Sequence, residues 1–236
     1  MIKTIGLSKI FRTESVQTTA LNEVSLEINQ GEFVAIMGPS GCGKSTLLNM
    51  IGLLDSPTSG ELWFLDQEVS HYSENDRTDL RNGNLGFVFQ SFNLIDELTV
   101  FENVELPLLY AGVSTRERVK RVNEALERMQ IAHRTEHYPQ QLSGGQQLRV
   151  AIARAIVTNP RIILADEPTG NLDSHSTGEI MQILRELHKE GRTVILITHD
   201  NDIAERADRV IRISDGRIVE DTNRLVKHEE ESYEEA

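Results

Sequence analysis

Three short runs of hydrophobic residues set the framework of the chain. Residues 32–37, 162–165 and 193–197 are almost wholly apolar, as is typical of central strands that are covered on both faces. Between the last two runs, apolar residues recur at helical spacing and Gly191 follows: Ile180, Ile183, Leu184 and Leu187. This strand–helix–strand order predicts a crossover connection and therefore a parallel or mixed sheet.

The two ends of the chain show a different strand pattern. Residues 2–10 and 21–28 alternate roughly between apolar and polar positions, which predicts an N-terminal antiparallel β part. Near the other end, Asp215-Gly216 joins residues 209–214 to residues 217–220, and this pair of residues is typical of a β-hairpin turn.

The middle of the chain lacks strand-like runs. An amphipathic helix is indicated there by apolar residues at helical spacing: Val119, Val122, Ala125, Leu126 and Met129. We therefore predict one α/β domain over residues 1–225, in which 1–90 and 160–225 form the core and 91–159 form an inserted helical subdomain. The acidic residues 226–236 are too charged to form a core and are predicted to be a disordered tail.

Composition narrows the classes of protein. The 236 residues are 39% hydrophobic and 26% charged, as in ordinary globular domains. No stretch reaches the roughly 18 apolar residues of a membrane span, and no cleavable signal begins the chain, so we expect a cytosolic location. The net charge of −13 argues against broad binding of nucleic acid or anionic lipid. Cys42 is the single cysteine, which excludes an internal disulfide framework.

The clearest motif is a glycine-rich loop between a predicted strand and a predicted helix that begins near Ser45. It reads Gly38-Pro39-Ser40-Gly41-Cys42-Gly43-Lys44-Ser45, followed by Thr46. Glycines let the loop curl its N–H groups toward phosphate oxygens, and the helix start adds partial positive charge. Lys44 is expected to reach the β and γ phosphates, and the Ser45 hydroxyl to ligate Mg²⁺.

A second acidic motif follows the apolar run 162–165. Side chains alternate along a strand end, so the carboxylates of Asp166 and Glu167 should point differently and serve different roles. Asp166 is the expected Mg²⁺ partner, and Glu167 is placed to polarise the attacking water. The alternative is a solvated turn, which the accompanying phosphate loop disfavours.

Adenine is the favoured base. A guanine site usually has an Asn-Lys-x-Asp segment, which this chain lacks, whereas adenine needs mainly a flat stacking surface. Phe11, just before the turn-like residues 12–15, is our candidate for that surface. The alternative for Phe11 is a place in the core.

A third motif, Leu142-Ser143-Gly144-Gly145-Gln146, opens a predicted helix that runs through Arg149, Ile152 and Ala155. This segment resembles the signature sequence of ATP-binding cassette (ABC) ATPases. Physically it is a second helix start suited to an anion, because Ser143 can cap the helix and two glycines allow close approach. The resemblance implies a head-to-tail homodimer on ATP binding, in which Ser143, Gly145 and Gln146 of one chain close over the ATP of the other.

Other segments resemble the same family in the same order, from about residue 2 to residue 225. Gln90 resembles the glutamine that touches Mg²⁺ and the attacking water and senses the membrane partner. Asn171-Leu172-Asp173 resembles the loop that crosses the dimer interface. His199, directly after a strand, resembles the histidine that contacts the γ phosphate. The resemblance thus implies an ATPase that uses ATP and Mg²⁺ and works with separate transmembrane permease subunits, at the cytoplasmic face of the membrane.

The finer similarity is to the branch with lipoprotein-releasing, macrolide-exporting and antimicrobial-peptide-resistance ATPases. It lies in residues 85–94, 102–108 and 165–173. Cys42, Leu148 and Phe11 depart from that branch, where serine, glutamine and tyrosine are common. None of these departures removes a required group.

Two alternatives come from other classes of protein. A DNA-repair or chromosome-organising ATPase would separate its nucleotide motifs by a long coiled coil, but only about a hundred residues without sustained heptads lie between Lys44 and Ser143. A regulatory ATPase of the cell-division type, which recruits a membrane partner without transport, would have identical chemistry and stays open. For the transport role, we predict that a membrane subunit docks just after Gln90, where apolar residues are dense: Phe92, Leu94, Ile95, Leu98, Val104, Leu106, Leu108 and Leu109.

Overall fold

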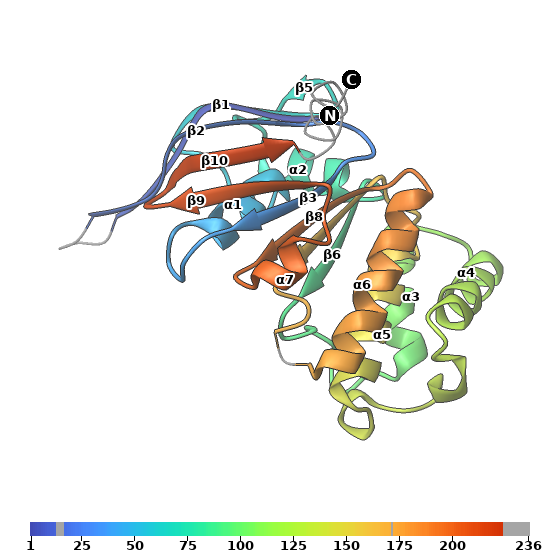
Figure 1. Ribbon diagram of the computed structural model, residues 1–236. Coiled ribbons are helices and arrows are strands. Elements are labelled where there is room, and N and C mark those ends of the chain that lie inside the picture. The colour runs from blue at the N-terminus through green and yellow to red at the C-terminus, as the bar shows by residue number, and fades with distance from the viewer. Residues whose placement is uncertain (13–16, 171, 224–236) are drawn as a thin grey trace, which may run out of the picture. The chain divides into compact units, whose positions relative to one another are not determined.

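The computed structural model describes residues 1–12, 17–170 and 172–223. The acidic tail predicted over 226–236 and Asn171 lie outside the described residues. The chain divides into two compact units, Met1–Asp79 with Thr193–Ala236, and Leu80–Arg192, and each is described by itself (Figure 1).

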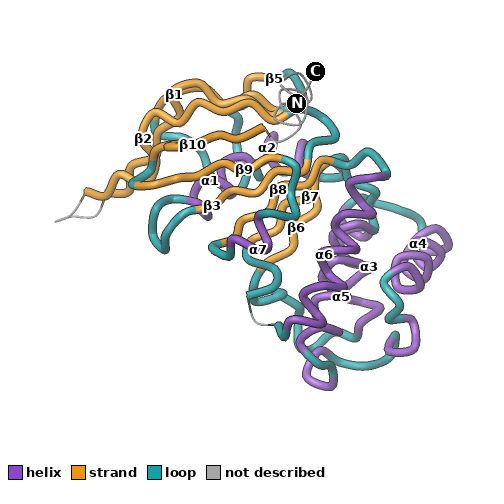
Figure 2. Tube along the Cα trace, viewed as in Figure 1, coloured by secondary structure: helices purple, strands orange, loops and turns teal. Residues whose placement is uncertain are grey.

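The first unit has an antiparallel sheet with the strand order β2-β1-β4-β5. Figure 2 shows its strands in orange, with β1, β2 and β5 labelled. Its strands are β1 (Ile2–Arg12), β2 (Gln17–Ile28), β4 (Ser59–Phe64) and β5 (Gln67–Glu68). Strand β1 pairs with β2 on one edge and with β4 on the other. The antiparallel N-terminal part predicted from alternation is therefore confirmed, with longer strands than the pattern indicated.

A second group of strands in this unit runs in the order β10-β9-β3-β8. These strands are β3 (Phe33–Met37), β8 (Thr193–Thr198), β9 (Arg209–Ser214) and β10 (Arg217–Asn223). Strand β3 is parallel to β8 and to β9, whereas β9 and β10 form the predicted antiparallel hairpin. Asp215 and Gly216 at its turn both have positive φ, as a tight two-residue turn requires.

Helices α1 (Lys44–Ile51) and α7 (Asn201–Ala204) complete this unit. Helix α1 contacts β2 and β4 of the antiparallel sheet and also β8, so it fills the space between the two groups of strands. Its buried side chains join those of β3 and β8, all of whose residues are buried. This core fixes the loop between β3 and α1.

The second unit pairs two parallel strands, β6 (Leu85–Phe89) and β7 (Ile162–Asp166), with a set of helices. The helices are α3 (Val100–Tyr110), α4 (Thr115–Arg128), α5 (Gly144–Ile156) and α6 (Ser174–Lys189), with short 3₁₀ turns at Ala132–Arg134 and Pro139–Gln141. Helix α2 (Glu74–Arg81) precedes β6 and buries no residue. Helix α5 packs on β6, and α3 and α4 pack on α5.

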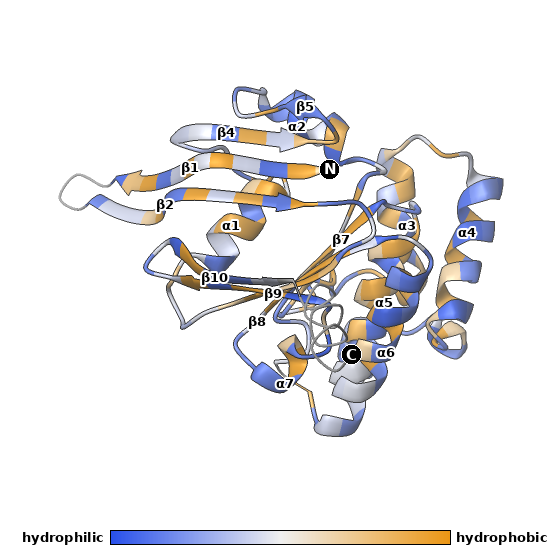
Figure 3. Ribbon diagram, turned by 45° about the horizontal axis from the view of Figure 1, so that its top comes forward, coloured by the Kyte–Doolittle hydropathy of each residue, from blue (hydrophilic) through white to orange (hydrophobic). Residues whose placement is uncertain are grey.

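The hydropathy of each element matches how far it is buried. Strand β7 is hydrophobic along most of its length, whereas α4 is mostly hydrophilic and presents one narrow apolar stripe (Figure 3). Together the strands give the α/β fold with a mixed, largely parallel sheet that the sequence predicts. No helix in the described part of the chain is long and apolar enough to cross a membrane.

Candidate functional site

The phosphate loop of the first unit runs from the end of β3 to the start of α1. Gly38 approaches other backbone so closely that a Cβ there would lie 2.2 Å from the Ile213 carbonyl oxygen. Gly43 has φ of 106°, and a Cβ there would lie 2.3 Å from the Ala20 carbonyl oxygen. Both positions therefore require glycine, and the loop lies in close contact with the backbone of β2 and β9.

Lys44 points into this loop. Its side chain is 6% exposed, and Nζ donates to the carbonyl oxygens of Gly38, at 2.8 Å, and Pro39, at 2.9 Å. The ammonium group is thus held inside the curl of its own loop, beside the N-terminus of α1. Gly43 is the N-cap residue of α1 and offers no side-chain cap, so the helix start suits an anion.

The rest of the predicted loop forms its rim. Pro39, Ser40, Gly41 and Ser45 are exposed, Thr46 is half-buried, and Cys42 is buried. The Cys42 carbonyl accepts a hydrogen bond from the Gly216 N–H at 3.0 Å, which ties the loop to the β9–β10 turn. The helix begins at Lys44, one residue before the predicted start.

Phe11 lies on β1 and is 46% exposed, so the core alternative for this residue is wrong. It pairs with Thr18 of β2, two residues before Ala20, whose carbonyl touches the loop at Gly43. The Lys9 ammonium lies 5.2 Å from the centroid of the Phe11 ring. An exposed aromatic face therefore lies on the same hairpin that supports the phosphate loop.

His199 also belongs to this unit. It directly follows β8, and Thr198 is the register partner of Met37, the residue before Gly38. The two strands are parallel, so His199 and the phosphate loop leave the sheet at the same edge. His199 is exposed, and the next residue, Asp200, caps helix α7.

In the second unit, Gln90, Asp166 and Glu167 stand at two neighbouring strand ends. Asp166 ends β7 opposite Phe89, and Gln90 follows Phe89. The Gln90 amide nitrogen lies so near Gly170 that a Cβ on that glycine would be 3.1 Å away. Asp166 and Glu167 are half-buried, and Glu167 has φ of 44°, a left-handed conformation that is strained for a residue other than glycine.

The signature segment forms the predicted capped helix start. The Ser143 Oγ accepts from the Gln146 N–H at 3.3 Å, and the Gln146 side-chain oxygen accepts from the Ser143 N–H at 3.1 Å. Gly144 and Gly145 follow as the first helical residues, and Ser176 lies beside Gly145. The glycines leave the start of α5 without the side chains that would cover its N–H groups.

Asp173 has a structural role that the sequence did not predict. It is the N-cap of α6, and its carboxylate accepts from the Ser176 N–H at 2.9 Å and from the Ser176 hydroxyl at 2.7 Å. These bonds lower the pKa of Asp173 below its ordinary value.

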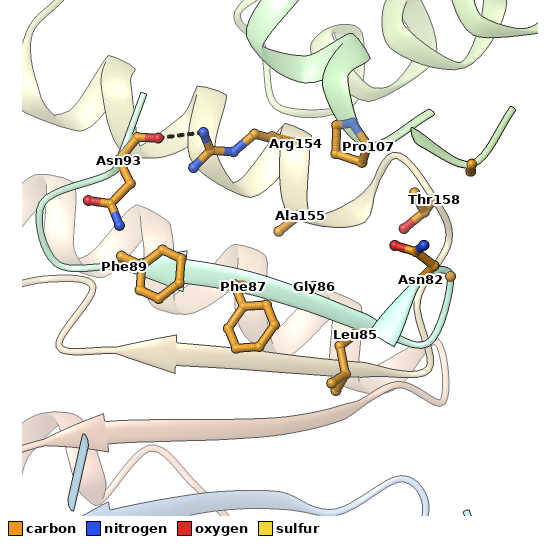
Figure 4. A pocket seen from close by; sticks show the side chains of 12 residues that line it. Asn82, Leu85, Gly86, Phe87, Phe89, Asn93, Pro107, Arg154, Ala155 and Thr158 are labelled. Atoms are coloured by element: carbon orange, nitrogen blue, oxygen red, sulfur yellow. Dashed lines mark hydrogen bonds between the residues drawn. The ribbon is translucent and has the colours of Figure 1, made fainter. Parts of the chain in front are cut away.

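A pocket of about 300 Å³ lies in the second unit among β6, α3 and α5 (Figure 4). Phe87 and Phe89 form its floor with their rings stacked, the centroids 5.5 Å apart. Arg154 of α5 lies on its wall and donates to the carbonyl oxygens of Phe92 and Asn93. Burial lowers the pKa of Arg154, although a guanidinium remains charged in proteins.

The predicted docking residues differ in their exposure to solvent, and none of them lines this pocket. Val104 and Leu108 are fully buried in α3, so they pack internally and cannot meet a partner. Ile95 and Leu109 are exposed, at 43% and 44%. Tyr110 is 79% exposed and was not among the predicted residues. Phe92, Leu94, Leu98 and Leu106 are half-buried.

The strand–loop–helix with an inward lysine, the acidic strand end and the capped glycine helix define a P-loop ATPase with a second anion-binding helix start. A family model described as ABC transporter matches residues 21–170. The chain belongs to this family, as the ATP-binding, ATP-hydrolysing part of an ABC system.

Its relatives match nearly the whole chain. It is 49% identical over 224 residues to the uncharacterized ABC transporter ATP-binding protein MJ1508 of Methanocaldococcus jannaschii, covering 95% of this chain and 100% of that protein. It is 50% identical to the macrolide export ATP-binding/permease protein MacB of Rhodospirillum rubrum, of which it spans 34%. The dimeric post-hydrolysis structure of the cassette MJ0796, bound to ADP and Pi, matches with a TM-score of 0.89 and 45% identity, covering 95% of this chain and 99% of that one.

Proposed function

We propose that this chain is the nucleotide-binding subunit that drives a separate membrane transporter, and that it acts as a head-to-tail homodimer. One observation supports this most directly. The described residues include two glycine-flanked helix starts suited to phosphate, at α1 and α5, and one belongs to each compact unit. A single nucleotide in a single chain needs only one of them, so a second copy would use the other.

The residues then divide the work of hydrolysis. The loop Gly38–Thr46 binds the phosphates, Lys44 neutralises the β and γ phosphates, and Phe11 stacks on adenine. Ser45, Gln90 and Asp166 offer the hydroxyl, amide and carboxylate oxygens that Mg²⁺ prefers. The bound Mg²⁺ would offset negative charge on the phosphates.

Glu167 orients and polarises the attacking water, and His199 contacts the γ phosphate. The half-buried position of Glu167 supports this role, because a carboxylate shielded from bulk solvent is a stronger acceptor. From the partner copy, Ser143, Gly145 and Gln146 would close over the nucleotide, and Asp173 would approach the interface. The Ser143 hydroxyl accepts within its own capping box and keeps its hydrogen for a phosphate oxygen.

The pocket beside Arg154 is the proposed docking site for a short helix of the permease. Its aromatic floor offers an apolar surface, and Ile95, Leu109 and Tyr110, which are exposed, lie within two residues of its lining residues Asn93, Pro107 and Ala111 along the chain. Since the docking segment begins at Gln90, contact with a permease would be felt directly in the Mg²⁺ site.

The relatives named for macrolide export favour an exporter of macrolide-like cargo. From the family branch that the sequence resembles, we also infer peptide or lipoprotein as alternative cargo classes and a place on the cytoplasmic face of the membrane. A regulatory ATPase of the cell-division type is the second candidate, because the chemistry of the chain would be the same.

The test is the oligomeric state of the Glu167→Gln variant. The amide keeps the shape of the side chain but accepts no proton, so the variant should bind ATP and hydrolyse it at least a hundredfold more slowly. Light scattering with saturating ATP should give twice the monomer mass, and ADP should leave the monomer. The Lys44→Ala variant is the control that should stay monomeric with both. A Glu167→Gln variant that is monomeric in saturating ATP would contradict the shared-site proposal.

A further inference from the structure

The segment that follows Gln90 is an irregular loop that presents apolar side chains. It links β6 to α3, has no ladder partner, and exposes Ile95 while Leu94 and Leu98 are half-buried. Phe92 and Asn93 both have left-handed backbone, with φ of 61° and 47°. Such a segment loses much conformational entropy when it is ordered, so something must hold it in place.

The first half of the loop is held from α5. The Arg154 guanidinium donates through Nη1 to the Asn93 carbonyl oxygen, at 2.6 Å, and through Nη2 to the Phe92 carbonyl oxygen, at 2.8 Å. A planar guanidinium with two parallel donors fixes the orientation of both peptide groups. These two bonds hold the left-handed backbone at Phe92 and Asn93, and Figure 4 draws the bond to Asn93.

The second half of the loop is held by Asn103 of α3. Its side chain is 0% exposed, and its Oδ1 accepts from the Ile95 N–H at 2.8 Å. Its Nδ2 donates to the carbonyl oxygens of Ile95, at 3.0 Å, and Leu98, at 3.1 Å. A further bond of 3.0 Å reaches Thr99, one helical turn back.

These bonds make one amide group the hub of the loop. Asn103 lies on the buried face of α3 with Val100, Val104 and Leu108, where a polar side chain is costly unless its hydrogen bonds are made. The amide meets this requirement through the loop, because both its oxygen and its nitrogen bond to loop backbone. The fold of α3 and the shape of the loop are therefore coupled through a single side chain.

We propose that Asn103 is a positioning residue for permease docking. It touches neither nucleotide nor partner, because it is fully buried, but it sets the place of Ile95 and Leu98. A loop held in its bound shape costs little entropy to dock, so the hub raises affinity for the permease without a contact of its own. This inference rests on the docking role given above to the neighbourhood of the pocket.

Hydrogen exchange on the full-length chain tests the positioning directly. The Asn103→Ala variant removes the acceptor for the Ile95 amide, which should then exchange about tenfold faster, together with neighbouring amides up to Thr99. Val104→Ala is the matched control: it empties a fully buried position on the same helix and should lower the melting temperature without changing exchange at Ile95.

A second variant separates the loss of these hydrogen bonds from a general loss of the fold. Asn103→Asp retains an oxygen for the Ile95 amide. Its neutral carboxyl also keeps one O–H donor for the carbonyls of Ile95 and Leu98, whereas its carboxylate has none. Its Ile95 amide should stay protected at low pH, where the carboxyl is neutral, and lose protection as the carboxylate forms beside those carbonyl oxygens. In the wild-type chain and in the Val104→Ala variant, the protection of the Ile95 amide should not depend on pH in this way.

The functional readout is stimulation of ATP hydrolysis by the permease that co-purifies with the chain, reconstituted in phospholipid vesicles. Asn103→Ala should need about tenfold more permease for half-maximal stimulation, with the stimulated maximum retained, as expected for a loss of preorganisation. Unchanged exchange at Ile95, or an unchanged half-maximal concentration, would overturn the positioning role. A wild-type chain that the permease does not stimulate would instead overturn the proposed function.

Discussion

Glu167 combines a proposed chemical role with a strained backbone, and the two can be separated by substitution. Its φ of 44° places it in the left-handed region, directly after the last residue of β7. A residue with a Cβ is held there at a cost of about 1–3 kcal/mol. Glycine adopts the same conformation freely, so Glu167→Gly should relieve this strain while it removes the carboxylate.

The effect of the strain on stability follows from comparing the glycine variant with the alanine variant, since neither retains the side-chain interactions of glutamate. Glycine loses about 0.4–1 kcal/mol because its unfolded chain is more flexible. The strain of about 1–3 kcal/mol that glycine relieves exceeds this loss, so Glu167→Gly should be more stable than Glu167→Ala by about 1 kcal/mol. In a helix the order reverses, so at the exposed position Asn123 of α4 the alanine variant should be the more stable by about 1 kcal/mol.

Thermal unfolding of the four variants without nucleotide measures both differences. A change of 1 kcal/mol corresponds to about 3 °C for a chain of this size. The glycine variant should melt above the alanine variant at position 167 and below it at position 123, and both Glu167 variants should lose ATP hydrolysis. If Glu167→Ala melts at or above Glu167→Gly, the backbone at this position is not strained and the reasoning is refuted.

Three further predictions concern separate parts of the molecule. Alkylation of Cys42 by N-ethylmaleimide should be slow because the thiol is buried. It should abolish ATP hydrolysis, and bound ATP should block it. Equal labelling with and without ATP would contradict the placement of Cys42 in the nucleotide site. The capping carboxylate of Asp173 has a lowered pKa, so its stabilisation is complete above the ordinary value of 3.8 and is lost as the pH falls; Asp173→Asn, which also caps, should remove this acid dependence of unfolding. The Ile95→Glu variant should lose permease binding and stimulation, whereas Val119→Glu, equally exposed on α4, should keep both.

The parts of the fold that the sequence predicts are those in which a local pattern decides the outcome. Strands β3 and β8 are buried at every residue, so no face needs to be polar and the apolar run is plain. The Asp215-Gly216 turn is equally local, since a two-residue hairpin demands positive φ. The phosphate loop belongs to the same class, because its glycines and lysine are contiguous.

Elements without such a pattern escaped prediction. Helix α2 buries no residue, so its sequence has no apolar stripe from which periodicity could be seen. Strand β4 begins with exposed polar residues and a glycine, and its pairing with β1 is a long-range contact. The first residues of β2 are likewise exposed, which explains why the predicted strand began at Leu21 instead of Gln17.

The proposed docking residues also show that a local sequence pattern does not determine which side chains are exposed. Density of apolar residues after Gln90 predicted a surface there, but density does not say which side of a helix each residue occupies. Val104 and Leu108 lie one turn apart on α3 and are both buried, while Leu109 lies just past that stripe and is exposed. The helix had to be placed, with its capping box at Thr99 and Glu102, before its faces could be assigned.

Once that helix is placed, Asn103 becomes visible in the sequence itself. Val100, Val104 and Leu108 recur at helical spacing, and Asn103 falls within their stripe. A polar side chain at a buried position must have its hydrogen bonds satisfied, and one turn of helix offers its amide only the carbonyl of Thr99. The remaining partners had to come from outside the helix, and the irregular segment just before it was the nearest backbone without its own ladder. A polar residue inside an apolar helical stripe must therefore find hydrogen-bond partners outside its own helix, and for Asn103 these partners are the backbone groups of the preceding loop.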